Sequence, residues 1–518
     1  MKVVLTTPPI MDYSSGHAWG RIVPIAQDKV RECPAYGIYM LANILQQAGH
    51  HVVVADLIAL GTHNIALYAD DIKDCSLVGI GTTSLSWPTA YAVIRQIRRM
   101  RPDVPIVLGG IHATMFDQYL LREFPIQYIV RGEGEIALLN LCNCLETEGD
   151  LSQVPNLSWR HADAGIVRNP LGPKISADDL AKFPVPDYST LPFGIYKGLS
   201  IESSRGCSFD CSFCSTSYRL GWRAIPPEQF VDRLETVMQY QDRTLLRNIH
   251  IVDDEFSMNP KRAMEIARVI RRRSLKPKLV YDSRATDLLW DGYVENIAEF
   301  TQQFLVGAEC GYDEGLKRIG KGTTCEILEK AAQTLERYGI SQRADFSFIL
   351  GLPWETKAEV DKTIRFAAHL YATYGVRILL QWYCQIPGSR LWEEDRQRGA
   401  VTEAMYNEFG FFRNLYLFST GVHLSPRDIW EVGEVVDELK LVARLRDPDR
   451  RMIEFSFPLP IYQNFPRELC DDQNTGLASL RQVSRPETVA RTVSVGRHSD
   501  STAPLAVGVP MRHFPGSD

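Results

Sequence analysis

Long apolar runs are missing from this chain, and their absence excludes one class of protein. No stretch approaches the roughly 18 to 20 apolar residues that a membrane-spanning helix needs. The longest runs, Ile38 to Leu45 and Ile378 to Tyr383, are short enough for core elements. No signal peptide is visible at Met1-Lys2-Val3-Val4. We therefore expect a cytoplasmic protein without transmembrane segments.

An excess of positive charge is missing as well. The net charge is −6, so the composition gives no reason to expect nucleic acid as a partner. The chain contains neither a GxGxxG dinucleotide fingerprint nor a P-loop, and no helix-turn-helix pattern. A hydrophobic content of 45% with 23% charged residues is typical of globular proteins. The length of 518 residues predicts two or three domains.

Cysteine is present in an odd number, 11, in a chain far longer than the secreted scaffolds that disulfides hold together. Three cysteines stand close together in the run Ser-Arg-Gly-Cys-Ser-Phe-Asp-Cys-Ser-Phe-Cys, at positions Cys207, Cys211 and Cys214. No second cysteine pair follows at the spacing of a structural zinc site. Cys142 and Cys144 lie far upstream, one residue apart.

This CxxxCxxC triplet predicts an open iron–sulfur site. Three thiolates can bind three irons of a 4Fe-4S cubane and leave the fourth iron without a protein ligand. An electron carrier normally closes its cluster with four cysteines, so a vacant position indicates chemistry on a substrate or cofactor. A structural zinc site, a disulfide pair and a chance cysteine-bearing loop are the alternatives.

Residues 1 to 165 read as strands alternating with helices, which predicts a doubly wound parallel sheet. Strands are expected at 2–7, 51–55, 77–84, 105–110 and from 128, with helices at 39–47 and 90–101. Ligands of such sheets bind at the carboxyl ends of the strands. Glycines and polar residues gather at those ends, where loops without bulky side chains let backbone approach a flat or phosphate-bearing ligand. They are Thr83, Ser84, Gly109, Gly110, Gly132 and Glu133. Alternatively, these are the ordinary loop glycines of a flavodoxin-like domain.

A Pro-rich linker is expected at 166–198, followed by a second α/β domain at 199–400. Six strand–helix units predict an incomplete parallel barrel with its site at the carboxyl ends of the strands. Strands are expected near 199–204, 247–252, 278–282, 303–307, 345–349 and 377–383. Beyond the barrel we expect a helical and aromatic region at 401–470 and a disordered tail at 471–518.

Polar residues stand where the barrel strands end, and three of them are candidate ligand contacts: Glu255, Arg284 and Glu309. A carboxylate at such a point can bind an amino group or ribose hydroxyls, and an arginine can pair with a carboxylate. Ordinary solvated loop charge is the alternative.

With Phe213 before its last cysteine, the triplet resembles the CxxxCxΦC signature of the radical S-adenosylmethionine (SAM) superfamily, in which Φ is aromatic. The resemblance implies that SAM chelates the unique iron and is cleaved to a 5′-deoxyadenosyl radical. It implies SAM contacts at Glu255, Arg284 and Glu309, and places Phe213 near the adenine. The turn Gly351-Leu-Pro-Trp-Glu-Thr356 is similar to the family's Gly-Φ-Pro-Gly-Glu-Thr, with Trp354 in place of glycine.

The first domain resembles the cobalamin-binding domain that precedes the barrel in one branch of this superfamily. The resemblance rests on Pro8-Pro9, Tyr36-Gly37, Asp56, Leu108-Gly-Gly-Ile-His-Ala-Thr114 and Val130-Arg-Gly-Glu-Gly-Glu135. It implies a cobalamin pocket that His112 lines.

A DxHxxG motif, which supplies a cobalt-binding histidine in other cobalamin proteins, is not intact in Ser15-Gly-His17. The second-shell carboxylate that usually fixes a metal-bound imidazole is absent there. We therefore expect base-off cobalamin without His17 as a cobalt ligand.

The two resemblances together imply a cobalamin-dependent radical SAM methyltransferase, acting on an unactivated carbon of a natural-product intermediate. A ring contraction or oxidative cyclisation, for example of a tetrapyrrole, is the alternative outcome. A cofactor-based sensor would usually add an output module, and none is visible. The expected partners are a small-molecule substrate and an electron donor such as flavodoxin or ferredoxin.

Overall fold

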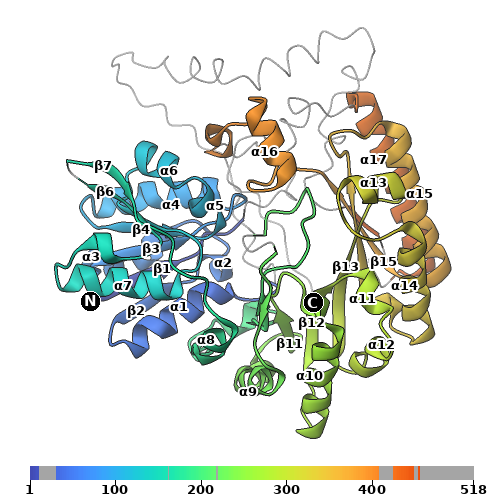
Figure 1. Cartoon of the computed structure of the whole chain (residues 1–518), viewed down its shortest axis with the longest axis horizontal. Coiled ribbons are helices and arrows are strands. Elements are labelled where there is room, and N and C mark those ends of the chain that lie inside the picture. Colours follow the sequence, from blue (N-terminus) through green and yellow to red (C-terminus); the bar gives the residue numbers. More distant parts are fainter. Residues whose placement is uncertain (11–30, 162, 217–219, 408–423, 449–452, 456–518) are drawn as a thin grey trace, which may run out of the picture.

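The computed structural model describes residues 1–10, 31–161, 163–216, 220–407, 424–448 and 453–455 (Figure 1). His17, the tail expected at 471–518 and much of the helical and aromatic region expected at 401–470 lie outside these ranges. None of the helices in the described ranges combines the length and apolarity needed to cross a membrane.

A seven-stranded sheet with strand order β2-β1-β3-β4-β5-β6-β7 forms the N-terminal domain. Its first five strands are parallel: β1 (Lys2–Thr6), β2 (His51–Ala55), β3 (Leu77–Gly81), β4 (Ile106–Gly109) and β5 (Tyr128–Val130). Valine, isoleucine and leucine dominate these strands because both faces of a doubly wound sheet are covered by helices. The predicted doubly wound sheet is confirmed.

Helices on the two faces of this sheet bury two separate cores. On one face, α1 (Tyr36–Gln47) and α7 (Glu135–Glu146) pack over Val3, Leu5 and Val107. On the other, α3 (Ala69–Asp74) and α4 (Trp87–Met100) pack over Val4, Val78 and Leu108. The short helices α2 (Leu57–Leu60), α5 (Ile111–Met115) and α6 (Asp117–Glu123) complete the domain.

An antiparallel hairpin that the sequence analysis missed extends the sheet at the β5 edge. It consists of β6 (Leu157–His161) and β7 (Gly165–Arg168). The predicted end of the domain at residue 165 falls inside this hairpin, because β7 continues to Arg168. Helix α8 (Ala177–Lys182) then lies within the segment expected to be a plain linker.

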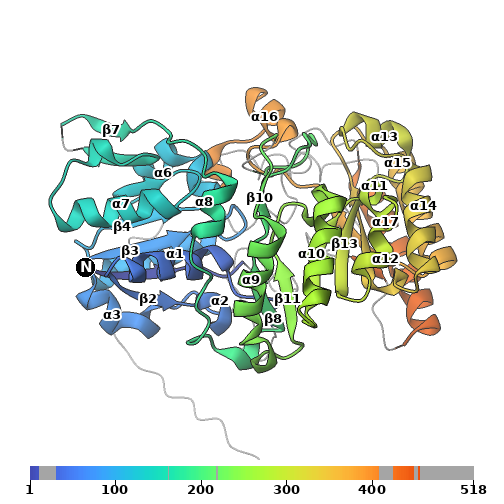
Figure 2. The same cartoon turned by 60° about the horizontal axis from the view of Figure 1, so that its bottom comes forward.

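The second domain is a parallel sheet that curves into an incomplete barrel, as predicted (Figures 1 and 2). Its strands, in chain and spatial order, are β8 (Gly198–Ile201), β11 (Asn248–Ile251), β12 (Lys278–Ser283), β13 (Thr301–Glu309), β14 (Ala344–Leu350) and β15 (Arg377–Trp382). A seventh strand, β16 (Ile453–Phe455), pairs in parallel with β15. The region beyond residue 400 therefore contributes to the barrel sheet, which the sequence analysis did not anticipate.

Helices between these strands cover the outside of the barrel. They are α9 (Pro227–Met238), α10 (Pro260–Arg272), α11 (Ala285–Leu288), α12 (Tyr293–Ile297), α13 (Asp313–Arg318), α14 (Cys325–Arg337), α15 (Lys357–Tyr374) and α17 (Pro426–Arg446). Alternate strand residues such as Phe304, Phe346 and Phe348 are buried beneath them. The intervening residues, including Glu309, face the barrel interior, because strand side chains alternate between faces.

Among the described residues, several contacts connect the domains, and two of them involve segments outside the sheets. In the linker tie, the Tyr196 hydroxyl donates to Asp56 Oδ2 at the end of β2 (2.7 Å), and Arg31 forms a bridge with Tyr196. The second tie is a return segment, residues 384–407, that contains α16 (Arg390–Gln397). Trp392 and Tyr406 of this segment join the N-terminal core beside Phe116.

Candidate functional site

The cysteine loop leaves β8 at one end of the barrel sheet and is closed at its base by a short antiparallel ladder. In this ladder, β9 (Ser204–Arg205) pairs with β10 (Arg223–Ala224). The Gly206 N–H donates to Asp254 Oδ2 (2.9 Å), and the Thr216 hydroxyl donates to Asp254 Oδ1 (2.7 Å). Asp254 follows β11, so a neighbouring strand end anchors both halves of the loop.

The three cysteines are free thiols, with Cys211 buried and the other two half-buried. Backbone contacts hold their loop against two other segments: the Ser212 N–H donates to Ile319 O (2.8 Å), and the Leu391 N–H donates to Ser212 O (3.0 Å). The loop that carries the thiols is therefore fixed by the fold itself.

Among the residues that the structure describes, no three cysteine, histidine or acidic side chains are grouped tightly enough to hold a single metal ion. A zinc ion draws each sulfur to about 2.3 Å from one centre. A cubane instead takes one thiolate at each of three separate irons. Cys207, Cys211 and Cys214 would each bind a different iron of such a cubane.

Two cations face the thiols. Burial raises the pKa of the Cys207 thiol, while the positive charge of Arg284 lowers it. Burial likewise raises the pKa of the Cys214 thiol, and the positive charge of Lys321 lowers it. The Arg284 guanidinium lies 3.6 Å from the centroid of the Phe209 ring within the cysteine loop. It also donates to the carbonyl of Lys321. These charges favour thiolates, the form that binds iron.

Lys321 is a site residue that the sequence analysis missed. Its ammonium group donates to Glu309 Oε1 (2.7 Å), and both side chains are less than a tenth exposed. Burial disfavours the charged amine, but the negative charges of Glu309 and Cys211, with the hydrogen bond to Glu309, together raise the pKa of Lys321. Lys321 stands between Gly320 and Gly322, both with φ of +70°, a left-handed conformation that suits glycine. That Gly-Lys-Gly run is the sequence feature that could have indicated Lys321 as a site residue.

Glu309 is the last residue of β13, and Glu255 follows β11, which is separated from β13 by β12. Both therefore stand where barrel strands end, as expected from the sequence. Glu309 has a φ of +65° at an irregularity in the β13–β14 pairing, and such strained backbone at a strand end is common at functional sites. Glu255 is buried, and burial, aided by the charge of Asp287, raises its pKa to about 8. Its carboxylate accepts from the Ser257 hydroxyl (2.5 Å).

Phe213 is half-buried and packs against the barrel core. Its ring centroid lies 6.0 Å from Lys321 Nζ. The structure therefore brings Phe213, Arg284, Glu309 and Lys321 around the cysteine loop. Their assignment to SAM remains a prediction.

The Gly351–Thr356 turn is fixed by Glu355, which is fully buried. Glu355 Oε2 accepts from the Gly351 and Leu352 N–H groups (2.8 and 2.9 Å), and Oε1 accepts from the Tyr312 hydroxyl (2.9 Å). Trp354 donates its indole N–H to that same hydroxyl (3.2 Å). Trp354 thus braces the turn through Tyr312.

Substituting Glu355→Gln is expected to remove a pH dependence of stability. Burial raises the pKa of Glu355 from 4.5 to about 7. Between these values the unfolded chain releases a proton that the folded chain keeps, so the folded state loses stability as the pH rises. The loss is complete above about pH 7 and amounts to at most about 3 kcal/mol.

Thermal unfolding at a series of pH values from about 5 to about 8 tests this prediction. The difference in melting temperature between Glu355→Gln and the unmodified protein should grow with pH and then level off. Glu336→Gln, at an exposed position of α14, is the matched control and should show no trend. Parallel curves for Glu355→Gln and the unmodified protein would contradict the assignment.

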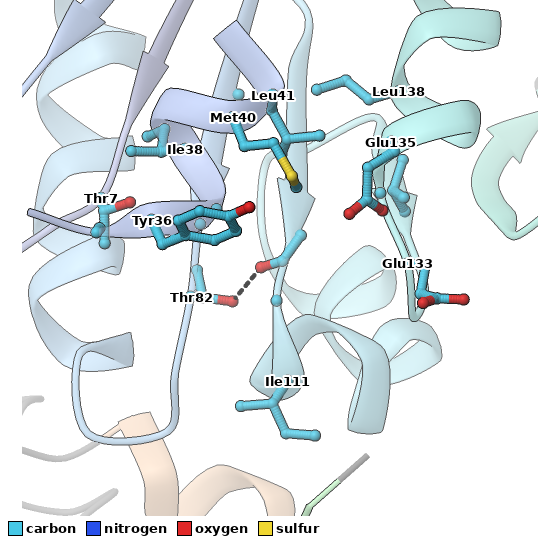
Figure 3. Close-up of a pocket in the computed structure, with 18 of the residues that line it drawn as sticks. Thr7, Tyr36, Ile38, Met40, Leu41, Thr82, Ile111, Glu133, Glu135 and Leu138 are labelled. Carbon is cyan, nitrogen blue, oxygen red and sulfur yellow. Dashed lines mark hydrogen bonds between the residues drawn. The ribbon is translucent and has the colours of Figure 1, made fainter. Parts of the chain in front are cut away.

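A cavity of about 470 Å³ opens at the carboxyl ends of β1, β3 and β4, where doubly wound sheets bind ligands (Figure 3). Five of the residues proposed from the sequence line it: Thr83, Gly109, Gly110, Gly132 and Glu133. The barrel domain contributes to the same wall with Glu202, Ser204, Arg205, Val252 and Asp254. The cavity therefore lies directly beside the base of the cysteine loop.

Gly110 shows why this wall admits only the smallest side chain. Its φ is +90°, and a Cβ atom built there would lie 2.4 Å from the Thr82 carbonyl oxygen. The Thr82 hydroxyl donates to the Gly109 carbonyl (2.9 Å), which ties the β3 and β4 loops together (Figure 3). The result is a flat backbone surface suited to a large planar ligand.

Ser84 and His112 were assigned to the pocket from the sequence, but the structure places both outside the cavity lining. Ser84 Oγ lies 3.0 Å from His112 Nδ1, and the imidazole stacks on Trp87 with a centroid distance of 4.9 Å. Burial lowers the pKa of His112 to about 3. Because α5 begins at Ile111, His112 turns into the aromatic core behind the β4 loop. It is a neutral core residue there.

Among the described residues that line the cavity there is no histidine, cysteine or lysine. Most of the side chains that line the cavity are small or apolar, such as Met40. A few carry a hydroxyl or a carboxylate, such as Thr7 and Glu135 (Figure 3). Such a cavity fits a corrin ring held by its faces and its peripheral amides.

A buried ion network joins the cavity to the cysteine loop. Arg205 donates to three carboxylates: Glu202 (2.6 Å), Glu133 (3.0 Å) and Glu135. Arg223 also donates to Glu133 (3.0 Å). Burial raises the pKa of Glu202, and the charge of Arg205 opposes that effect. Carboxylates from both domains thus meet on the strands that close the cysteine loop.

The open cysteine loop, the incomplete barrel and the glycine-lined cavity define a class of enzyme that pairs cluster chemistry with a large planar cofactor. A family model described as the Radical SAM superfamily matches residues 201–367. A second, described as a B12 binding domain, matches residues 26–142. The two matched ranges fall on the barrel and on the N-terminal domain.

Individual proteins agree with this class. An uncharacterised methyltransferase of Pyrococcus horikoshii is 31% identical over 411 residues, covering 76% of this chain and 83% of the relative. The anaerobic magnesium-protoporphyrin IX monomethyl ester cyclase of Rubrivivax gelatinosus is 30% identical over 307 residues, covering 56% of this chain and 53% of the cyclase. The solved structure of the radical SAM methyltransferase TsrM from Kitasatospora setae has a TM-score of 0.61 at 20% identity, with 77% of each chain covered.

The chain belongs to the radical SAM enzymes that carry a cobalamin-binding domain. Its cofactors are a 4Fe-4S cluster, SAM and cobalamin, as the sequence indicated.

Proposed function

We propose that the enzyme transfers a methyl group from methylcobalamin to an unactivated carbon of a small molecule, an intermediate of specialised metabolism. The observation that carries the proposal is the match to the Pyrococcus methyltransferase, which covers both domains and most of both chains. The match to the cyclase covers about half of the cyclase.

The shared wall between cavity and cysteine loop supports this reaction. Residues of both domains line one cavity, so a corrin bound there lies beside the cluster loop. When bound, the cluster supplies the electron that cleaves SAM, and the cobalamin supplies the methyl group. Holding both reactants in one chain replaces a bimolecular encounter with a fixed geometry.

Residues of this chain have three tasks in the proposal. Cys207, Cys211 and Cys214 hold the cluster. Lys321 and Arg284 present positive charge beside it for the SAM carboxylate, and Glu309 keeps the Lys321 ammonium oriented. An electron donor such as flavodoxin or ferredoxin reduces the cluster, which requires a reducing compartment such as the cytoplasm.

An oxidative ring closure, as named for the cyclase relatives, is the second candidate because those relatives share up to 30% identity with the chain. It would use the same three cofactors. The outcomes differ in mass, since methylation adds a methylene unit and oxidative cyclisation removes hydrogen.

Methyl transfer is tested with SAM carrying a deuterated methyl group. Anaerobically reconstituted enzyme, a reductant and a panel of metabolite extracts should yield a product that carries the label, together with 5′-deoxyadenosine. The Cys207→Ala variant is the control and should yield neither. A dehydrogenated, unlabelled product would contradict methyl transfer and favour ring closure.

A further inference from the structure

One buried carboxylate oxygen in the cavity has no hydrogen-bond partner among the described residues. Glu135 is 3% exposed, lines the cavity and begins helix α7. Its Oε1 atom accepts from Arg205, but Oε2 is buried without a donor. Figure 3 shows this carboxylate pointing into the cavity near Met40. Leaving a buried acceptor unmatched costs about 1–3 kcal/mol, so a ligand donor is expected there.

No side chain among the described residues donates a hydrogen bond to that oxygen. Arg205 uses Nε for Glu202, Nη1 for Glu133 and Nη2 for Glu135 and Glu202. The other carboxylates of the network are acceptors themselves. The network therefore fixes the orientation of Glu135 and leaves one buried carboxylate oxygen without a donor at the wall of the cavity.

We propose that Glu135 Oε2 accepts a hydrogen bond from a peripheral carboxamide of the corrin ring and makes the enzyme selective for fully amidated corrinoids. A primary amide offers the N–H that the oxygen lacks. A corrinoid with a carboxylate at that position would place two anions together in a buried site, which is unfavourable. The inference concerns recognition of the cofactor and does not depend on whether the final product is methylated.

The position of Glu135 gives the interaction a second consequence. The same carboxylate holds Arg205, which lies in the ladder that closes the cysteine loop. An amide bound to Oε2 thereby completes the hydrogen bonding of a network that spans both domains. Glu135 acts here as a specificity-determining residue.

Corrinoid binding to the full-length, cluster-reconstituted protein tests the proposal without any turnover. The probes are cobalamin and its monocarboxylic acids, in each of which one peripheral amide in turn is a carboxylic acid. Anaerobic equilibrium dialysis with absorbance detection gives the dissociation constants. For the unmodified protein, one isomer should bind at least about tenfold more weakly than cobalamin. The other isomers should bind nearly as well as cobalamin.

The Glu135→Gln variant should reverse this preference. Its amide can donate to the carboxylate of the disfavoured isomer, so that isomer should bind about tenfold better than to the unmodified protein. Cobalamin should bind several-fold more weakly. Glu123→Gln, on the surface helix α6 of the same domain, should leave every constant unchanged.

Two results would overturn the proposal: equal affinity of all isomers for the unmodified protein, or unchanged discrimination in Glu135→Gln. Circular dichroism of each variant before corrinoid addition excludes misfolding as the cause of a change. If Glu135→Gln does not fold, Glu135→Asp replaces it. Its shorter carboxylate cannot reach the same amide, so discrimination should fall there too, and retained discrimination would contradict the proposal.

Discussion

Alanine at any one of Cys207, Cys211 or Cys214 is expected to abolish formation of 5′-deoxyadenosine from SAM. The sequence of the loop contains three cysteines and no fourth, so the loss of one leaves the cluster with two ligands from the loop. A cluster with two vacant corners is readily lost or cannot hold SAM at one defined iron. Chromatography of 5′-deoxyadenosine, iron analysis and the electron paramagnetic resonance spectrum of the reduced protein measure the loss.

Cys144→Ala is the matched control for this series. Cys144 is also a half-buried free thiol, but it lies on α7 of the N-terminal domain. Its replacement should leave iron content and 5′-deoxyadenosine formation unchanged. A Cys211→Ala protein that still binds four irons and cleaves SAM would show that the triplet is not the cluster site.

The second large effect is expected for Lys321→Met. The substitution leaves the Glu309 carboxylate buried without its counter-charge, because Lys321 Nζ lies 2.7 Å from Glu309 Oε1 in a site that is less than a tenth exposed. Removal of one partner from a buried ion pair costs about 3–5 kcal/mol. Denaturant unfolding of the cluster-free protein should show a loss of this size.

The double variant Glu309→Gln with Lys321→Met separates stability from function. It removes both charges, so most of the lost stability should return. SAM binding is measured by the change that SAM causes in the spectrum of the reduced cluster. It should remain impaired if Lys321 binds the SAM carboxylate. Restored stability together with restored SAM binding would reduce the pair to a structural role.

Local spacing made the cysteine site predictable, because three ligands within eight positions must lie on one loop whatever the fold. The alternation of strands and helices likewise determined both sheets, since apolar runs bounded by polar turns leave few other arrangements. The glycines after β4 and β5 reach the cavity because the carboxyl ends of parallel strands lie at one edge.

Lys321 escaped prediction for the opposite reason. Its partner Glu309 is on the preceding strand, and a lysine in a glycine-containing loop usually reaches solvent. Only the curvature of the barrel and the left-handed glycines on either side of Lys321 direct its amine toward Glu309. The pairing is a property of the assembled barrel and of no short segment.

His112 illustrates an error of orientation. It stands two positions after Gly110, which lines the cavity, but its ring packs against Trp87 and Tyr406 instead. Tyr406 comes from the return segment, nearly three hundred positions away in the chain, so the aromatic core that buries His112 was invisible locally.

The β6–β7 hairpin and strand β16 were missed because each is short and pairs only at a sheet edge. An edge strand is stabilised by one neighbour and needs little apolar character of its own. Its existence depends on the sheet that it joins, which a sequence window does not contain.

The linker tie and the return segment attach the barrel to the N-terminal domain through two separate stretches of chain. The return segment with α16 lies at the top of the views in Figures 1 and 2. Because both domains also line the cavity, a substitution that loosens either attachment should alter the shape of the ligand site without touching any residue that lines it.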